Sequence, residues 1–122
     1  MAHYQDLRAW QVAHQLALDV SRVVGIFPRN ERFELTSQLR RAALSVPTNI
    51  AEGQGRYGSR EALRFARIAA GSLWEVDYLL HFARDRGYLD SETFEHLVEQ
   101  RKHTSRLLTR LIRSLRQAPP SP

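Results

Sequence analysis

Apolar residues recur every three or four positions through most of this chain, which is the spacing of amphipathic α-helices. Short stretches that carry glycine, proline or a helix-capping residue separate four such segments. The pattern predicts helices at residues 6–24, 31–53, 60–86 and 91–117. Because short connections place neighbouring helices antiparallel, we expect an all-α protein, an up-down-up-down four-helix bundle. The 122 residues suit one domain, which we assign to residues 1–117.

Local signals mark the ends of the predicted helices. Asp6 and Asn30 are suitable N-caps for the first and second helices. The segment Gly53–Gly58 carries three glycines and is predicted to be the longest flexible connection. The tail at residues 118–122 is rich in proline and cannot continue the last helix, so we expect it to be disordered.

Pro47 interrupts the apolar stripe of the second helix without ending it, because the stripe continues to Ile50. A proline inside a helix lacks the N–H that would bond the carbonyl of Ala43, and its ring crowds that carbonyl. We therefore expect a kink near Pro47. The side-chain amide of Asn49 is expected to satisfy a backbone group that the kink frees.

The third predicted helix is apolar around more than half of its circumference. Its apolar residues form two neighbouring lines, one with Leu63, Ala66, Ala70, Leu73 and Leu80 and the other with Phe65, Ile68, Ala69, Val76, Leu79 and Ala83. A helix of this kind is usually covered on several sides, by its own bundle or by another subunit. The pattern therefore favours self-association.

Composition narrows the classes of partner. The formal net charge is +5, and every basic residue except Lys102 is arginine, whose planar guanidinium suits phosphate and carboxylate groups. The absence of cysteine excludes a disulfide framework, a thiolate zinc site and a cysteine nucleophile. No apolar run approaches the ~20 residues that span a bilayer, and the N-terminus lacks a signal-peptide pattern. We expect a cytoplasmic protein without membrane contact.

The fourth predicted helix carries a continuous basic face. At ~100° per residue one stripe collects its cations. These are Lys102, Arg106, Arg110, Arg113 and Arg116. Such a face is typical of contact with a nucleic-acid backbone. The alternative is a solvated outer face, or one paired with acidic residues of the first helix or of another subunit.

A second basic set flanks the glycine-rich connection. Arg40 and Arg41 lie beside the apolar stripe of the second helix, and Arg56 and Arg60 border the glycines. The four guanidinium groups are expected to gather near one end of the bundle as a second anion site. Alternatively, the glycines only turn the chain and Arg56 pairs with Glu52. The connection lacks the lysine-serine pair of a P-loop, which argues against nucleotide hydrolysis.

No catalytic or metal-binding pattern accompanies these cations. Paired metals in four-helix bundles use Glu-x-x-His elements. None of the five histidines has a glutamate three positions earlier. No Ser-His-Asp arrangement follows from the spacing either. We therefore expect no enzyme activity, no metal and no cofactor.

The motifs of the chain, taken together, are similar to those of one family. They are Tyr4-x-Asp6-Leu7-x-Ala9-Trp10-Gln11, Phe27-Pro28-x-x-Glu31-x-Phe33-x-Leu35, Gln38-Leu39-Arg40-Arg41-Ala42-Ala43, Ser45-Val46-Pro47-x-Asn49-Ile50-Ala51-Glu52-Gly53, Gly55-Arg56, Phe65, Ile68-Ala69-x-Gly71-Ser72-Leu73-x-Glu75 and Gly87-Tyr88-Leu89. In these motifs the chain resembles the four-helix-bundle family of the 23S rRNA-intervening sequence proteins.

The resemblance implies a small bacterial cytosolic protein that assembles as a homopentameric ring. A related branch comprises the accessory proteins of diversity-generating retroelements, which bind nucleic acid and a reverse transcriptase. The sequence therefore predicts a non-enzymatic homo-oligomer that binds nucleic acid, RNA rather than DNA, through arginine–phosphate contacts. A reverse transcriptase is an expected partner if the chain belongs to the retroelement branch. The alternative is a protein-interaction ring without direct nucleic-acid contact.

Overall fold

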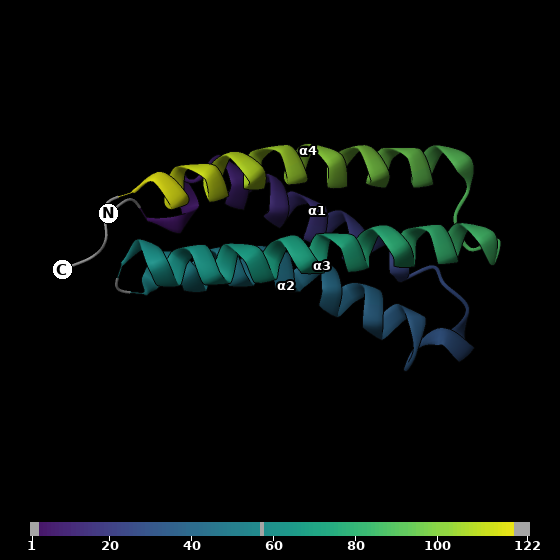
Figure 1. Cartoon of the computed structure of the whole chain (residues 1–122). Helices are drawn as coiled ribbons and strands as arrows, with labels where there is room; N and C mark the ends of the chain where they lie inside the picture. The colour runs from purple at the N-terminus through teal and green to yellow at the C-terminus, as the bar shows by residue number, and fades with distance from the viewer. Residues whose placement is uncertain (1–2, 57, 119–122) are drawn as a thin grey trace.

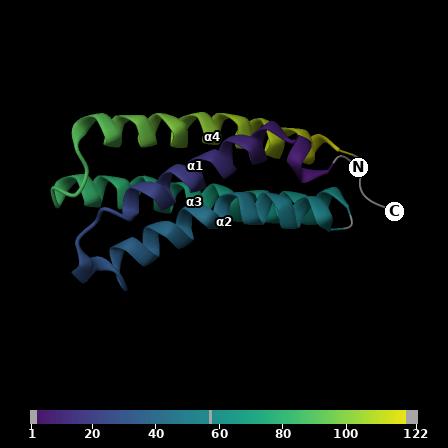
Figure 2. The ribbon, with the colours of Figure 1, turned by 180° about the vertical axis from the view of Figure 1, so that it is seen from behind.

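The protein is an antiparallel four-helix bundle. The computed structural model describes residues 3–56 and 58–118. Within these residues the α-helices are α1 (Arg8–Val24), α2 (Leu35–Gly55), α3 (Ser59–Asp85) and α4 (Ser91–Gln117). Short 3-10 turns, η1 (Tyr4–Asp6) and η2 (Arg29–Glu31), precede α1 and α2. The contacts of α1 are with α2 and α4, and those of α3 are with the same two helices, so the helices form a closed square (Figures 1 and 2).

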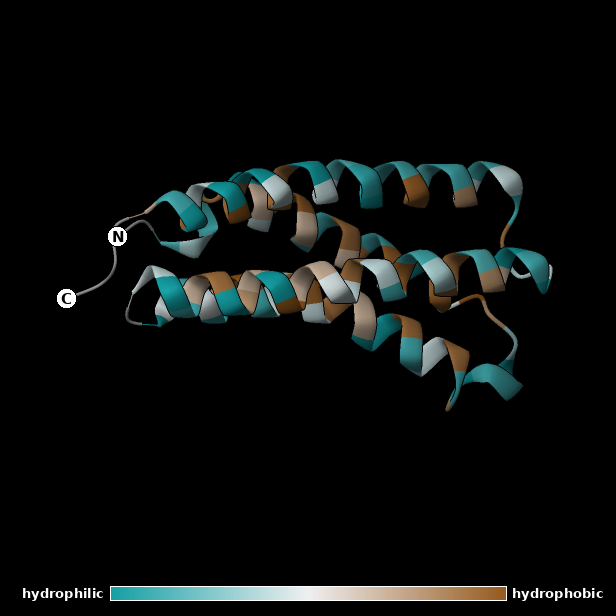
Figure 3. Cartoon of the chain, in the orientation of Figure 1, coloured by the Kyte–Doolittle hydropathy of each residue, from teal (hydrophilic) through white to brown (hydrophobic). Residues whose placement is uncertain are grey.

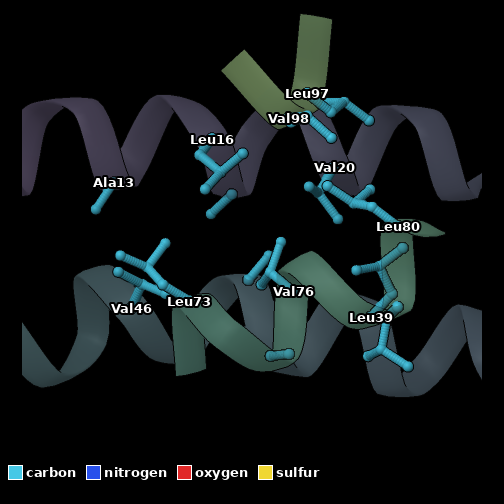
Figure 4. Close-up of a cluster of buried hydrophobic side chains, with 14 of the residues drawn as sticks. Ala13, Leu16, Val20, Leu39, Val46, Leu73, Val76, Leu80, Leu97 and Val98 are labelled. Atoms are coloured by element: carbon cyan, nitrogen blue, oxygen red, sulfur yellow. The ribbon is translucent and has the colours of Figure 1, made fainter. Parts of the chain in front are cut away.

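One apolar core runs along the bundle axis. Each helix contributes to it, for example through Leu16, Val46, Leu73 and Leu97, which point toward one another in Figure 4. Hydrophilic residues make up most of the visible α4 ribbon, as expected of a helix with one buried face (Figure 3). No helix in the described part of the chain is long and apolar enough to cross a membrane.

The structure corrects the start of the first two helices. Asp6 belongs to η1 and does not cap α1, because the extended backbone of Leu7 separates the two elements. Asn30 lies within η2, and α2 begins at Leu35 and not at residue 31. The reason is local: Glu34 has φ −116° and ψ −101°, which is incompatible with a continuous helix.

The later helices follow the prediction closely. α3 begins and ends one residue before the predicted 60–86, and α4 has the predicted bounds. Asp90 caps α4 by accepting a 2.7 Å hydrogen bond from the backbone N–H of Thr93, and this bond lowers the pKa of Asp90. Of the tail predicted to be disordered, residues 119–122 lie outside the described part of the chain.

α2 continues through Pro47, and its ribbon changes direction around the middle of the helix, so its first half leans away from α3 (Figures 1 and 2). The amide of Asn49 donates to the carbonyl of Ser45 at 2.8 Å. The predicted role of Asn49 was therefore wrong in detail, because the carbonyl that Pro47 leaves without a helical partner is that of Ala43. The same amide lies 2.9 Å from Ser45 Oγ, which shares a 2.8 Å hydrogen bond with Ser72 Oγ of α3.

The connection between α2 and α3 is shorter than predicted. α2 runs through Gly53 to Gly55, and α3 begins at Ser59. Gly53 is buried and serves packing, not turning: a Cβ atom there would lie 2.8 Å from Phe65 Cβ and 3.2 Å from the carbonyl oxygen of Ala62. α2 and α3 therefore approach as closely as they do because position 53 has no side chain.

This contact yields a stability prediction. Gly53→Ala should lower the free energy of unfolding by about 1–3 kcal/mol, since the added methyl forces the two helices apart. Gly55→Ala is the matched control on the same helix, because nothing lies within 4 Å of its Cβ position. The control should leave stability unchanged or raise it by up to about 1 kcal/mol. Urea unfolding followed by circular dichroism measures both, and equal effects of the two variants would contradict the packing role of Gly53.

Candidate nucleic-acid interface

The basic row of α4 is exposed to solvent along its whole length. Its five members, Lys102, Arg106, Arg110, Arg113 and Arg116, all lie on the outer side of the helix. In residues 3–56 and 58–118 none of them forms an ion pair with a carboxylate. The described part of the chain therefore does not neutralise the charge of this row. We call it the α4 basic row below.

Arg101 immediately precedes this row but has a different environment. Its side chain is buried against α3, where Nη2 lies 3.1 Å from Asp77 Oδ1 and the guanidinium stacks 5.1 Å from the ring of Trp74. His81 Nδ1 lies 3.6 Å from the other carboxylate oxygen of Asp77. Sequence reasoning passed over Arg101, although it falls on the buried line of Leu97 and Leu108. This ion pair fixes the register between α3 and α4.

A second carboxylate, Asp19, joins α1 to α4. Its Oδ1 accepts hydrogen bonds from Gln15 at 3.0 Å and Arg22 at 3.1 Å. Its Oδ2 accepts one from Gln100 at 2.6 Å and lies 3.7 Å from His96 Nε2. Asp19 is thus occupied by structural partners. Among the described residues no three His, Asp or Glu side chains are grouped so that they could hold a metal ion.

The secondary arginines do not gather as predicted. Arg56 pairs with Glu52 at 3.2 Å, as the alternative interpretation expected, and its guanidinium lies 5.1 Å from the Phe65 ring. Arg41 precedes Arg56 by fifteen residues of continuous helix, which corresponds to about 22 Å at a rise of about 1.5 Å per residue. Arg40 and Arg41 therefore lie in the other half of the bundle, and only Arg56 and Arg60 lie at the end that carries the last turns of α4 (Figure 1).

Three contacts near the middle of the bundle show which parts of neighbouring helices lie side by side. Ser45 meets Ser72, Asp77 meets Arg101, and Asp19 meets Gln100. Because the helices are antiparallel, these pairs place residues 3–14, 46–56, 58–72 and 104–118 in one half. We call this the terminal half, since it contains the start of α1 and the end of α4 (Figure 1). Residues 15–45 and 73–103 form the other half.

The two halves differ sharply in charge. The terminal half contains nine arginines against three carboxylates, whereas the other half contains nine basic residues against ten carboxylates. The whole positive excess of the chain therefore lies in the terminal half. Four members of the α4 basic row belong to it, and Arg56 and Arg60 lie in the same half. An anionic polymer would meet this end of the bundle first.

The fold and the charge distribution define the class of the protein: an antiparallel four-helix bundle with one strongly basic end. A family model matches residues 5–110, and the chain belongs to the family described as 23S rRNA-intervening sequence protein.

A solved structure supports the fold. The chain is similar to the crystal structure of a protein of unknown function from the S23 ribosomal protein family of Bacteroides thetaiotaomicron, with 18% sequence identity and a TM-score of 0.80. The similarity covers 86% of this chain and 95% of that one. No curated protein matches the chain.

The buried ion pair between Asp77 and Arg101 is expected to stabilise the fold. Asp77→Asn should lower the free energy of unfolding by about 1–3 kcal/mol, because it leaves the buried guanidinium of Arg101 without its counter-charge. Asp85→Asn is the control, since Asp85 pairs with Arg84 on the exposed surface and should contribute little. Urea unfolding compares the two variants, and a cost no greater for Asp77→Asn than for Asp85→Asn would contradict the structural role of the pair.

Proposed function

We propose that the protein is a non-enzymatic homo-oligomer that binds nucleic acid through arginine–phosphate contacts at its terminal half. The observation that carries the proposal is the exposed α4 basic row, which forms no ion pair within the described part of the chain. Four of its five members lie in the half that holds all the excess positive charge. Such a surface binds a phosphate backbone by releasing its condensed counterions, without reading the base sequence. Arg40 and Arg41 are not part of the proposed interface, because they lie in the other half.

RNA is the nucleic acid that we favour. The name of the family connects it with ribosomal RNA. The α4 basic row carries no aromatic side chain on which unpaired bases would stack. The proposed contact is therefore to the backbone and shape of the RNA.

Self-association is the second part of the proposal. Large apolar side chains remain exposed along α3 although the bundle core is complete. Trp74, Tyr78 and Phe82, which follow one another at four-residue spacing on α3, are 66%, 63% and 39% exposed. A row of this kind is typical of a surface that another subunit covers. The resemblance of the sequence motifs supplies the number of subunits, five, and a closed ring would repeat the terminal half in five equivalent positions.

The binding proposal is tested with a charge-removal pair. Arg110→Gln/Arg113→Gln takes two cations from the α4 basic row, and Arg22→Gln/Arg84→Gln takes two exposed cations from the other half. Each phosphate contact contributes about one unit to the slope of log K against log salt concentration. The first variant should lower that slope by up to about two for each subunit in contact and weaken binding at low salt. The second should bind as the unchanged protein does.

Fluorescence anisotropy with labelled RNA and DNA of mixed sequence, titrated with salt, measures these slopes. Binding that is absent at low salt, or indifferent to salt, would reject the nucleic-acid proposal. The alternative is a protein-interaction ring that makes no contact with nucleic acid. The exposed apolar row on α3 favours this alternative, because a ring of subunits would cover that row.

The oligomer proposal is tested with a second pair. Tyr78→Lys places a charge in the exposed row of α3, where a covering subunit would have to desolvate it. Leu18→Lys is the control, because Leu18 is 43% exposed on α1, away from that row. Light scattering during gel filtration should give the mass of a pentamer for the unchanged protein and the control, and a smaller mass for Tyr78→Lys. A 14.1 kDa monomer for the unchanged protein would refute self-association.

A further inference from the structure

The connection between α1 and α2 separates charges by sign. Basic residues line a surface groove of about 400 Å³ beside the end of α1, and acidic residues line a neighbouring groove beside α3. The basic groove contains Val24, Gly25, Phe27, Pro28, Arg29, Arg32, Thr36 and Arg40. The acidic groove includes Glu31, Glu34, Gln38, Tyr78, Phe82 and Arg86. The basic groove belongs to the half of the bundle remote from the proposed nucleic-acid interface.

Local geometry produces this separation. Thr36 and Arg40 are four residues apart in α2, so they follow one line of that helix. Arg32 lines the same groove from the turn that precedes α2. Arg29 joins them from η2. Glu31 turns the other way and accepts a 2.8 Å hydrogen bond from the hydroxyl of Tyr88. Glu31, although close in sequence to Arg29 and Arg32, is therefore bound to Tyr88 and does not neutralise the basic groove.

The three arginines of the groove, Arg29, Arg32 and Arg40, are exposed. In the described part of the chain none of them forms an ion pair. The guanidinium of Arg32 lies 5.1 Å from the centre of the Phe33 ring. Like charges around one hollow repel each other, and an anion in the hollow would relieve that repulsion. The hydroxyl of Thr36 adds a neutral hydrogen-bond donor to the wall, and the floor is closed by Val24 and Phe27.

We propose that this groove binds the diphosphate group of a small phosphorylated ligand. Each guanidinium can donate two parallel N–H hydrogen bonds to phosphate oxygens. The charge of three guanidinium groups matches that of a diphosphate better than that of a single phosphate. The volume lies within the range of small-molecule sites. The site goes beyond the proposed nucleic-acid function, because it uses different residues in the other half of the bundle.

A different explanation is that these arginines stabilise the C-terminal end of α1. The carbonyl end of a helix carries partial negative charge, and arginines near it stabilise the helix. This explanation predicts that loss of Arg40 destabilises the protein whether or not an anion is present. The diphosphate site predicts that the effect of Arg40 appears in the affinity for the anion.

The test uses inorganic pyrophosphate as the probe and Arg41 as the matched control. Arg41 is exposed on the same helix and does not line the groove. Isothermal titration should show pyrophosphate binding more tightly than orthophosphate at the same ionic strength. Arg40→Gln and Arg32→Gln should each weaken pyrophosphate binding by about tenfold or more, as expected for a charge-assisted hydrogen bond. Arg41→Gln should leave the affinity unchanged.

Two further variants show whether pyrophosphate and RNA bind at different places. Arg110→Gln/Arg113→Gln should retain pyrophosphate binding in the groove, and Arg40→Gln should retain the salt-dependent binding of RNA. Failure of the nucleic-acid proposal would thus leave the groove result intact, and the reverse also holds. An RNA oligonucleotide that displaces pyrophosphate would overturn the small-ligand assignment. Equal loss in Arg40→Gln and Arg41→Gln, or no heat of binding at millimolar pyrophosphate, would overturn the site itself.

Discussion

The close approach of α2 to α3 is the constraint on which the rest of the bundle depends. It is possible because Gly53 has no side chain to meet Phe65, and the Ser45–Ser72 hydrogen bond fixes its register. With α3 set against α2, Asp77 faces α4 and pairs with Arg101. That pair in turn fixes the rotation of α4, and with it the outward direction of the basic row. The surface charge is thus a consequence of contacts made in the interior.

Helical periodicity predicted the four helices, because each buries one face and the spacing of apolar residues records that face. The failures have local causes. Asn30 has the side chain of a cap, but the backbone around it forms a 3-10 turn that ends at Glu31, and α2 begins only after Glu34. Gly53 has the sequence signature of a turn, yet it lies inside α2 because a close helix–helix contact also requires glycine. Sequence alone does not distinguish these two uses of the residue.

The candidate site was predictable only in part. The positions of Arg106 and Arg110 on an outer face follow from the 100° rotation per residue. Arg101 does not stand out in this way, since its burial depends on Asp77, which lies 24 residues away in the chain. The opposite charge of the two halves was also invisible, because it appears only when antiparallel helices are aligned level by level. The wrong grouping of Arg40 with Arg56 has a simpler cause, because the length of helix between them already places them far apart.

The charge difference between the halves bears on how a small bundle could hold a long polyanion. Exposed arginines contribute little individually, because solvent and salt screen them. In the proposed ring each subunit presents the same basic half in an equivalent position, so one backbone can meet several equivalent patches. Once the first patch is engaged, the others bind at a high effective concentration, and weak contacts combine into a stable complex. A monomer with an identical surface would lack that gain, which makes the apolar row on α3 as important for the proposed binding as the arginines themselves.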